Sequence, residues 1–199
     1  MKNRDVFINC PFSADFAPHF YAIVFTIIRS GFKPRCALEA DDGAENRFDK
    51  ICMIIAQCDY GIHDISKTEP DAHSGLPRFN MPLELGLFLA AKKFGVAQHR
   101  RKKCIVFDKL PYRYQQFMSD ISGQDIHSHN NSIPKLIEVL ASWLRREAAD
   151  KKVPGGNAIY REYRKFQSGL PVLCREIQLK QSELTFDDFR RMVEKWVLA

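Results

Sequence analysis

The sequence lacks any run of eighteen or more apolar residues, so it offers no obvious segment for crossing a membrane as a helix. Its first residues, Met1 to Val6, lead directly into an apolar segment and lack the hydrophobic stretch of a signal peptide. From these two absences we expect a soluble, cytoplasmic protein without a membrane partner.

The six cysteines form no Cys-x-x-Cys pair, so the sequence supports neither a zinc ribbon nor a disulfide framework. Most of them lie within or beside apolar segments, where reduced core thiols are expected. His127 and His129 form a His-x-His pair, but a zinc site needs three or four well-placed ligands. We therefore expect no functional metal.

The chain also lacks internal repeats, low-complexity tracts and a glycine-rich phosphate loop. Its formal net charge is +6, but the basic residues are dispersed except for the run from His99 to Lys103. A run of that length is usually a solvated loop. We therefore do not expect a nucleic-acid partner, and the positive charge suits an anionic small molecule such as a nucleotide.

What the chain does contain is a regular alternation of short apolar segments with longer amphipathic ones. The spacing predicts strands over 5–10, 32–38, 58–64 and 104–108, with helices over 16–30, 46–57 and 80–93 between them. Pro34 cannot donate to a strand ladder, so the second strand is expected at an edge. The alternation predicts an α/β fold with a doubly wound, mainly parallel, Rossmann-like or flavodoxin-like sheet.

The second half of the chain carries a different pattern. Residues 111–125 predict a helix with an aromatic face, and 133–146 predict the last helix of the sheet domain. Residues 148–157 contain Pro154, Gly155 and Gly156 and are the best linker candidate. We therefore expect a nucleotide-binding α/β domain over 1–147 and a small helical extension over 157–199.

The segment from Arg78 to Lys93 carries the main candidate for chemistry. Asn80 is expected to cap the helix, Pro82 to occupy its first position, and Glu84 to lie in its first turn. There the helix dipole would hold the Glu84 carboxylate ionised. The simpler interpretation is that Glu84 merely complements that dipole.

Polar residues follow the predicted strands where a parallel sheet gathers its carboxyl ends. Asp64, Ser66, Asn80, Glu84 and Asp108 should therefore converge on one edge. A carboxylate in such a crevice suits cleavage of a bond to a sugar anomeric carbon, because it can stabilise or trap an oxocarbenium-like centre. Arg78 or Arg35 could bind a phosphate of the same ligand.

Three of these segments together resemble a known group. A strand ending Asp64-Ile65-Ser66, the helix start Asn80-Met81-Pro82-Leu83-Glu84-Leu85-Gly86 and a strand ending in Asp108 resemble the nucleoside 2-deoxyribosyltransferase-like group, which is related in architecture to TIR-type NAD-cleaving domains. The resemblance covers roughly the first 110 residues.

The resemblance implies a role for several residues. Glu84 would be the catalytic carboxylate and Asp64 a substrate-binding neighbour, while Asn9, Pro11 and Phe12 would line the same pocket. It also implies NAD, a nucleoside or a nucleotide as substrate without a required cofactor, a homo-oligomer, and a place in bacterial antiviral defence or nucleotide signalling.

Three functions remain open from the sequence. The first is an enzyme that cleaves or transfers an N-glycosidic bond through Glu84. The second is a non-catalytic nucleotide sensor that signals to a protein partner through the C-terminal helices. The third is a purely structural domain, in which Asp64 turns the chain and Glu84 only complements the helix dipole.

Overall fold

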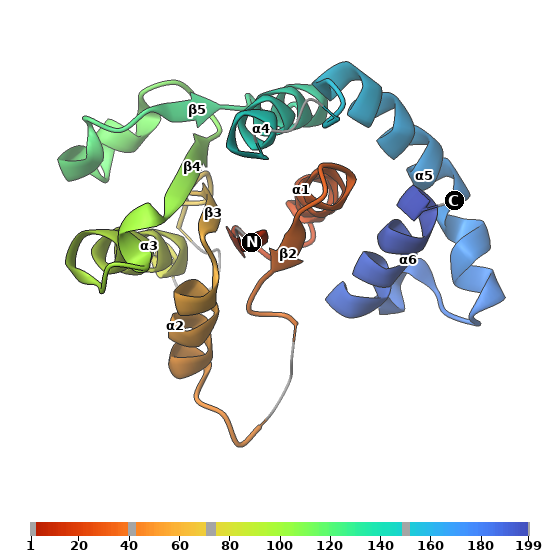
Figure 1. The fold of residues 1–199 in the computed structure, drawn as a ribbon, viewed down its shortest axis with the longest axis horizontal. Helices are drawn as coiled ribbons and strands as arrows, with labels where there is room; N and C mark the ends of the chain where they lie inside the picture. Colours follow the sequence, from red (N-terminus) through yellow and green to blue (C-terminus); the bar gives the residue numbers. More distant parts are fainter. Residues whose placement is uncertain (1–2, 40–42, 71–74, 149–151, 199) are drawn as a thin grey trace.

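The computed structural model describes residues 3–39, 43–70, 75–148 and 152–198 (Figure 1). Within these ranges the strands are β1 (Asp5–Asn9), β2 (Lys33–Arg35), β3 (Tyr60–Asp64), β4 (Lys103–Asp108) and β5 (Ile126–Ser128). The α-helices are α1 (Ala17–Arg29), α2 (Arg47–Gln57), α3 (Asn80–Phe94), α4 (Ile133–Ala148), α5 (Gly156–Glu176) and α6 (Phe186–Leu198). Residues 149–151 of the expected linker lie outside the described residues.

The strands form one parallel sheet in the order β2-β1-β3-β4-β5. Helices α1 and α4 cover one face, and α2 and α3 cover the other (Figure 1). This is the doubly wound α/β fold that the alternation predicted, and β2 is an edge strand as expected from Pro34. The strand order reverses between β1 and β3, which is where sheets of this kind bind ligands.

The two faces of β1 show how the pattern builds the core. Val6 and Ile8 pack into the cluster that contains α1 and α4, whereas Phe7 packs with the buried residues of α2 and with Phe88. Successive side chains of a strand point to opposite faces, so a strand covered on both sides is apolar throughout. Because side chains alternate along each strand, the polar residues at the strand ends are also divided between the two faces of the sheet.

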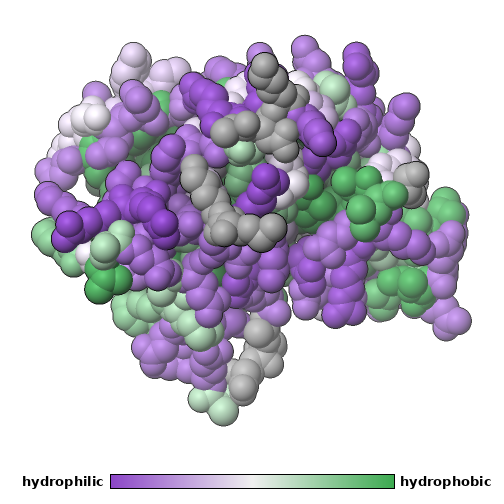
Figure 2. Space-filling model, in the orientation of Figure 1, coloured by the Kyte–Doolittle hydropathy of each residue, from purple (hydrophilic) through white to green (hydrophobic). Residues whose placement is uncertain are grey.

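The C-terminal helices pack against the outer side of α1 and α4 (Figure 1). Phe166 of α5 is fully buried with its ring centroid 5.5 Å from that of Phe25, and Phe189 of α6 stacks on Tyr21 at 4.3 Å. The extension is helical as predicted, and its apolar residues belong to the same hydrophobic cluster as α1 and α4. Its outer surface carries both hydrophobic and hydrophilic residues (Figure 2), and a groove of about 380 Å³ there is lined by apolar side chains such as Ile177 and Trp196 and by charged ones such as Glu176 and Lys195.

The prediction of a helix over residues 111–125 is wrong. The segment starts with a left-handed residue, Tyr112 (φ 57°), and forms two short 3-10 turns, Arg113–Gln116 and Ser119–Ile121, because Phe117 (φ −133°) and Met118 (φ −143°, ψ 57°) between them are not helical. The chain then pairs with β4 as β5, a strand that the sequence analysis did not predict. Three residues are too short to show a strand pattern.

Helix α3 differs from its prediction in start and in orientation. It begins at Asn80, so Asn80 is a helical residue and not the cap, and Pro82 is its third residue. Its buried residues are Met81, Leu85 and Phe88, whereas Leu83 is 55% exposed. Because positions three and four apart share a helix face, Glu84 lies on the inward side of α3.

Across the described ranges, every helix is too short or too polar to span a bilayer.

Candidate functional site

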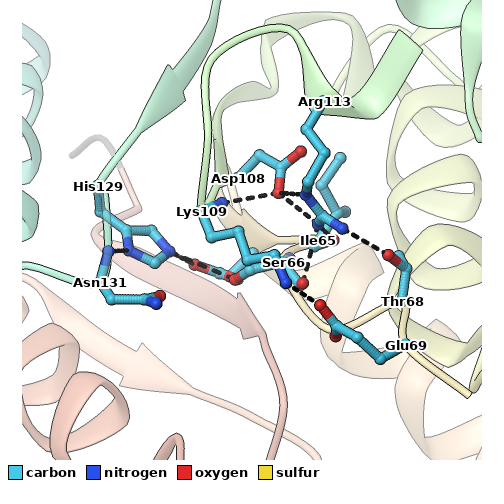
Figure 3. Close-up of polar contacts among 10 residues, drawn as sticks. Ile65, Ser66, Thr68, Glu69, Asp108, Lys109, Arg113, His129 and Asn131 are labelled. Atoms are coloured by element: carbon cyan, nitrogen blue, oxygen red, sulfur yellow. Dashed lines mark hydrogen bonds and ion pairs between the residues drawn. The ribbon is translucent and has the colours of Figure 1, made fainter. Parts of the chain in front are cut away.

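A buried polar cluster marks the edge where the strand order reverses. Asp64 ends β3 and is fully buried, and its Oδ1 accepts hydrogen bonds from the N–H of Ser66 (3.0 Å) and from the Ser66 hydroxyl. Its Oδ2 lies 3.2 Å from Nε2 of His129, and Ser66 Oγ lies 3.3 Å from the same nitrogen (Figure 3). Residues from β3, from its following loop and from the loop after β5 thus meet at one point.

The hydrogen bonds of His129 define what this cluster can do. The N–H of Asn131 donates to His129 Nδ1 at 3.0 Å, so the ring carries its hydrogen on Nε2, facing Asp64 and Ser66. A histidine that activates a serine must instead offer a free lone pair to the hydroxyl. His129 therefore lies against the buried Asp64 carboxylate, whose Oδ2 makes no hydrogen bond, and is not arranged to make Ser66 a nucleophile.

Replacing His129 by alanine should destabilise the protein by about 3 kcal/mol, because it removes a fully buried ring that lies 3.2 Å from the Asp64 carboxylate and leaves that carboxylate beside a cavity. Urea unfolding measures this directly. His127→Ala is the matched control, since that ring is only half-buried and its ring contact is with Phe107. Equal stability of the two variants would contradict a supporting role for His129.

Arg113 links the loop after β3 to the end of β4 through hydrogen bonds. Its Nε donates to Asp108 Oδ1 at 2.9 Å, and its Nη1 donates to Thr68 Oγ1 at 2.7 Å (Figure 3). Its Nη2 reaches the carbonyl oxygens of Ile65 (3.1 Å) and Ser66 (2.8 Å). Burial raises the pKa of Asp108 and the hydrogen bonds from Arg113 oppose that shift. Asp64 and Asp108 therefore do share one edge, with Arg113 between the segments.

A pocket of about 410 Å³ opens beside Ser66, within the size range of small-molecule sites. Its lining residues are Asp15, Phe16, His19, Ser66, Lys67, Glu69, Lys109 and Asn131. Lys67, in the loop after β3, reaches the loop after β1, where its Nζ donates to Ser13 Oγ (3.0 Å) and to Asp15 Oδ1 (3.0 Å). Lys109 is paired with Glu69. Both ammonium groups of the pocket are thus balanced by carboxylates.

A second polar group lies on the opposite face of the sheet, below α3. The Asn9 amide donates to the carbonyl of Met81 (2.8 Å) and to Nδ1 of His63 (3.0 Å), so it joins β1 and β3 to the start of α3. Burial lowers the pKa of His63 to about 3, and the ring stays neutral. A Cβ at Gly61 would lie 2.7 Å from His63 Nε2, so only glycine leaves room for this ring.

Glu84 lies on this same side, on the inward face of α3 and three residues after Met81. It is the fifth residue of the helix, beyond the first turn, so the expected stabilisation of its charge by the helix start was wrong. Burial instead raises the pKa of Glu84 to about 7, opposed by the charge of Arg47. Near neutral pH the carboxyl group is therefore present in both protonation states.

Cys10 is buried in the loop after β1. Burial raises the pKa of its thiol well above the usual value, and the charges of Asp64 and Glu84 raise it further. The thiol of Cys10 therefore stays protonated near neutral pH. Ser66 lines the pocket at the carboxyl edge of the sheet and Glu84 does not, so the convergence of Asp64 and Glu84 on one site stays a prediction.

The remaining predicted site residues lie in various places. Pro11 is buried in the loop after β1, while Phe12 is 39% exposed and packs edge-to-face on Phe20. The guanidinium of Arg35 is occupied by Asp5 (2.9 Å) and Glu39 (2.6 Å), away from the pocket, which argues against its role in binding phosphate. Arg78 and Asn80 are exposed before and at the start of α3.

Within the described part of the chain, no three His, Cys, Asp or Glu side chains are grouped closely enough to hold a metal ion. Comparisons with protein-family models, with curated proteins and with solved structures found no match to this chain. The residues of the two polar groups are therefore the basis for inferring function.

Proposed function

We propose that the carboxyl edge of the sheet binds a nucleotide-like molecule and that Glu84 promotes cleavage of its N-glycosidic bond. NAD, a nucleoside or a nucleotide would be the substrate, without a further cofactor. The observation that carries the proposal is a carboxyl group on the inward face of α3, beside the strand-order reversal, with a pKa raised to about 7 by burial. Strongly perturbed carboxyl groups at such a position are candidates for catalysis.

The chemistry needs one carboxylate close to the sugar. As the bond between C1′ and the base breaks, its electron pair leaves with the base and positive charge develops on the sugar, where ionised Glu84 stabilises it. In hydrolysis of a nucleoside, one water then supplies hydroxide to C1′ and a proton to the departing base. The resemblance to the deoxyribosyltransferase-like group implies that Asp64 holds the ribose hydroxyls, for which its buried carboxylate would have to exchange its contact with His129 for one with the sugar.

The test is release of free base from NAD, nucleoside monophosphates and deoxynucleosides, followed by chromatography. We expect release from one class and a loss of about a thousandfold or more in Glu84→Gln, because the amide cannot carry the stabilising charge. Glu138→Gln is the control, since Glu138 is exposed on α4. Equal rates for Glu84→Gln and wild type would overturn the proposal.

The pH dependence gives a separate prediction. If the ionised form of Glu84 acts, the rate should rise with pH and level off above a midpoint of about 7. A rate that falls through the same midpoint would show that the protonated form acts, as a general acid on the leaving base. Initial rates between about pH 5 and 9 distinguish the two forms.

One observation favours the second candidate, a nucleotide sensor. Phe16 and His19, which line the pocket beside Ser66, lie at the start of α1 and directly before Phe20 and Tyr21, which contact Phe186 and Phe189 of α6. A ligand in that pocket would thus touch the helix on which the extension packs. Ligand-induced thermal stabilisation without base release, abolished by Ser66→Trp and retained by Glu84→Gln, would favour sensing, with the C-terminal helices as the route to a protein partner.

A further inference from the structure

A basic pocket lies at the opposite edge of the sheet, where β3 and β4 begin. It has a volume of about 330 Å³. Its lining residues are Asp59, Tyr60, Lys92, Arg100, Arg101, Lys102 and Lys103. Five cationic side chains and a single carboxylate therefore share one concave surface in a chain whose whole formal net charge is +6.

The fold gathers charges that the sequence presents as an ordinary basic run. Lys92 lies in the last turn of α3, and a 3-10 turn, His99–Arg101, then leads the chain back to β4. Lys103 begins β4 beside Tyr60 of β3. The run expected to be a solvated loop thus forms one wall of a pocket.

The ion pairs leave most of this charge uncompensated. Lys103 pairs with Glu147 at 2.6 Å, and the fully buried Lys102 donates to the carbonyl oxygens of Ile55 and Cys58. Lys92, Arg100 and Arg101 are exposed and form no ion pair with any residue that the structure describes. Three cationic side chains without an ion pair among the described residues, next to the buried Lys102 ammonium, make the pocket favourable for an anion.

We propose that this pocket is a phosphate-binding site, separate from the proposed glycosidic site at the other edge. Two neighbouring guanidinium groups offer paired N–H donors that match the oxygens of phosphate, and the lysines add charge at close range. Phosphate could reach the pocket on a free nucleotide or in a nucleic-acid backbone. The same chemistry serves both sources, and binding measurements separate them.

The test uses the full chain with two probes, pyrophosphate by calorimetry and a fluorescent single-stranded DNA of about 20 nucleotides by anisotropy at several salt concentrations. The variant Arg100→Gln/Arg101→Gln should bind about tenfold or more weakly. With the DNA, its slope of log affinity against log salt should be smaller by about 1.4, because two phosphate contacts are lost.

Arg161→Gln/Arg175→Gln is the control, since it removes the same charge from exposed positions on α5. Binding of pyrophosphate alone would assign the site to a small phosphate-bearing ligand, and binding of DNA alone would assign it to a backbone; either supports a phosphate site. Absence of binding to both probes, or an equal loss of affinity in the control, would overturn the proposal. Neither variant touches Glu84, so base release should persist in both.

Discussion

Glu84→Gln is expected to unfold at a higher temperature than the wild type at about pH 8, and at nearly the same temperature at about pH 5. In the unfolded chain the carboxyl group ionises around its ordinary pKa of 4.5, whereas in the folded protein the pKa is raised to about 7. Between these values the folded state retains a proton that the unfolded state has lost. Wild-type stability therefore falls as the pH rises from 4.5 to 7, and the full cost persists above that range.

The size of the effect follows from that shift. Each pKa unit corresponds to about 1.4 kcal/mol, and partial solvent access to Glu84 reduces the total, so we expect a gain of about 1 to 2 kcal/mol for the amide at high pH. Melting curves of wild type, Glu84→Gln and Glu138→Gln across this pH range measure it. A gain that is independent of pH, or one shared by the control, would show that burial does not raise the pKa of Glu84.

Together with the expected loss of base release, this variant would be more stable and less active than the wild type. That combination is typical of a residue kept in an unfavourable environment for its chemistry. A residue that only complements a helix dipole would behave in the opposite way, since its removal would destabilise the protein.

Phe166→Ala should destabilise the whole protein by about 3 to 5 kcal/mol, the largest effect on stability that we predict. The ring is fully buried between Phe25 of α1 and Phe189 and Trp196 of the C-terminal helices. Its loss should affect the sheet part as well as the extension. Val172→Ala, at a site on α5 that is 48% exposed, should cost well under about 1 kcal/mol.

The two tryptophans allow the two parts to be followed separately. Trp143 lies in α4 and Trp196 in α6. The variant Trp143→Phe leaves Trp196 as a fluorescent probe of the extension, and Trp196→Phe leaves Trp143 as a probe of the sheet part. Coincident urea unfolding curves by fluorescence and by circular dichroism in each variant would show one cooperative unit. An earlier transition at Trp196 would instead support the separate domains, 1–147 and 157–199, that the sequence predicts.

The sheet could be predicted because its signal is local. Strands β1, β3 and β4 each appear in the sequence as a run of five or six mostly apolar residues beside an amphipathic helix. The alternation of such strands and helices is enough to predict a parallel, doubly wound sheet. The inward face of α3 could not be predicted in this way, because Leu83 and Leu87 offer as good a helical spacing as Met81, Leu85 and Phe88. The packing against Phe7 and His63 decides between the two, and it also decides the environment of Glu84.

The candidate site was predictable only where a strand end carries it. Asp64 and Asp108 are the last residues of recognisable strands, so their meeting at one edge could be expected. His129 and Arg113 follow a three-residue strand and a left-handed residue, and neither feature has a distinctive pattern in the sequence. The His-x-His pair did draw attention to His129, but as a metal ligand and not as the partner of Asp64.

The two outer strands bear on how copies of this chain can associate. β2 and β5 each contain three residues, and Pro34 at the centre of β2 has no N–H to offer to another strand. Short edges of this kind oppose the addition of strands from other molecules, which is how sheet proteins polymerise or aggregate. If copies of this chain associate, these edges therefore favour contact through the helices over extension of the sheet.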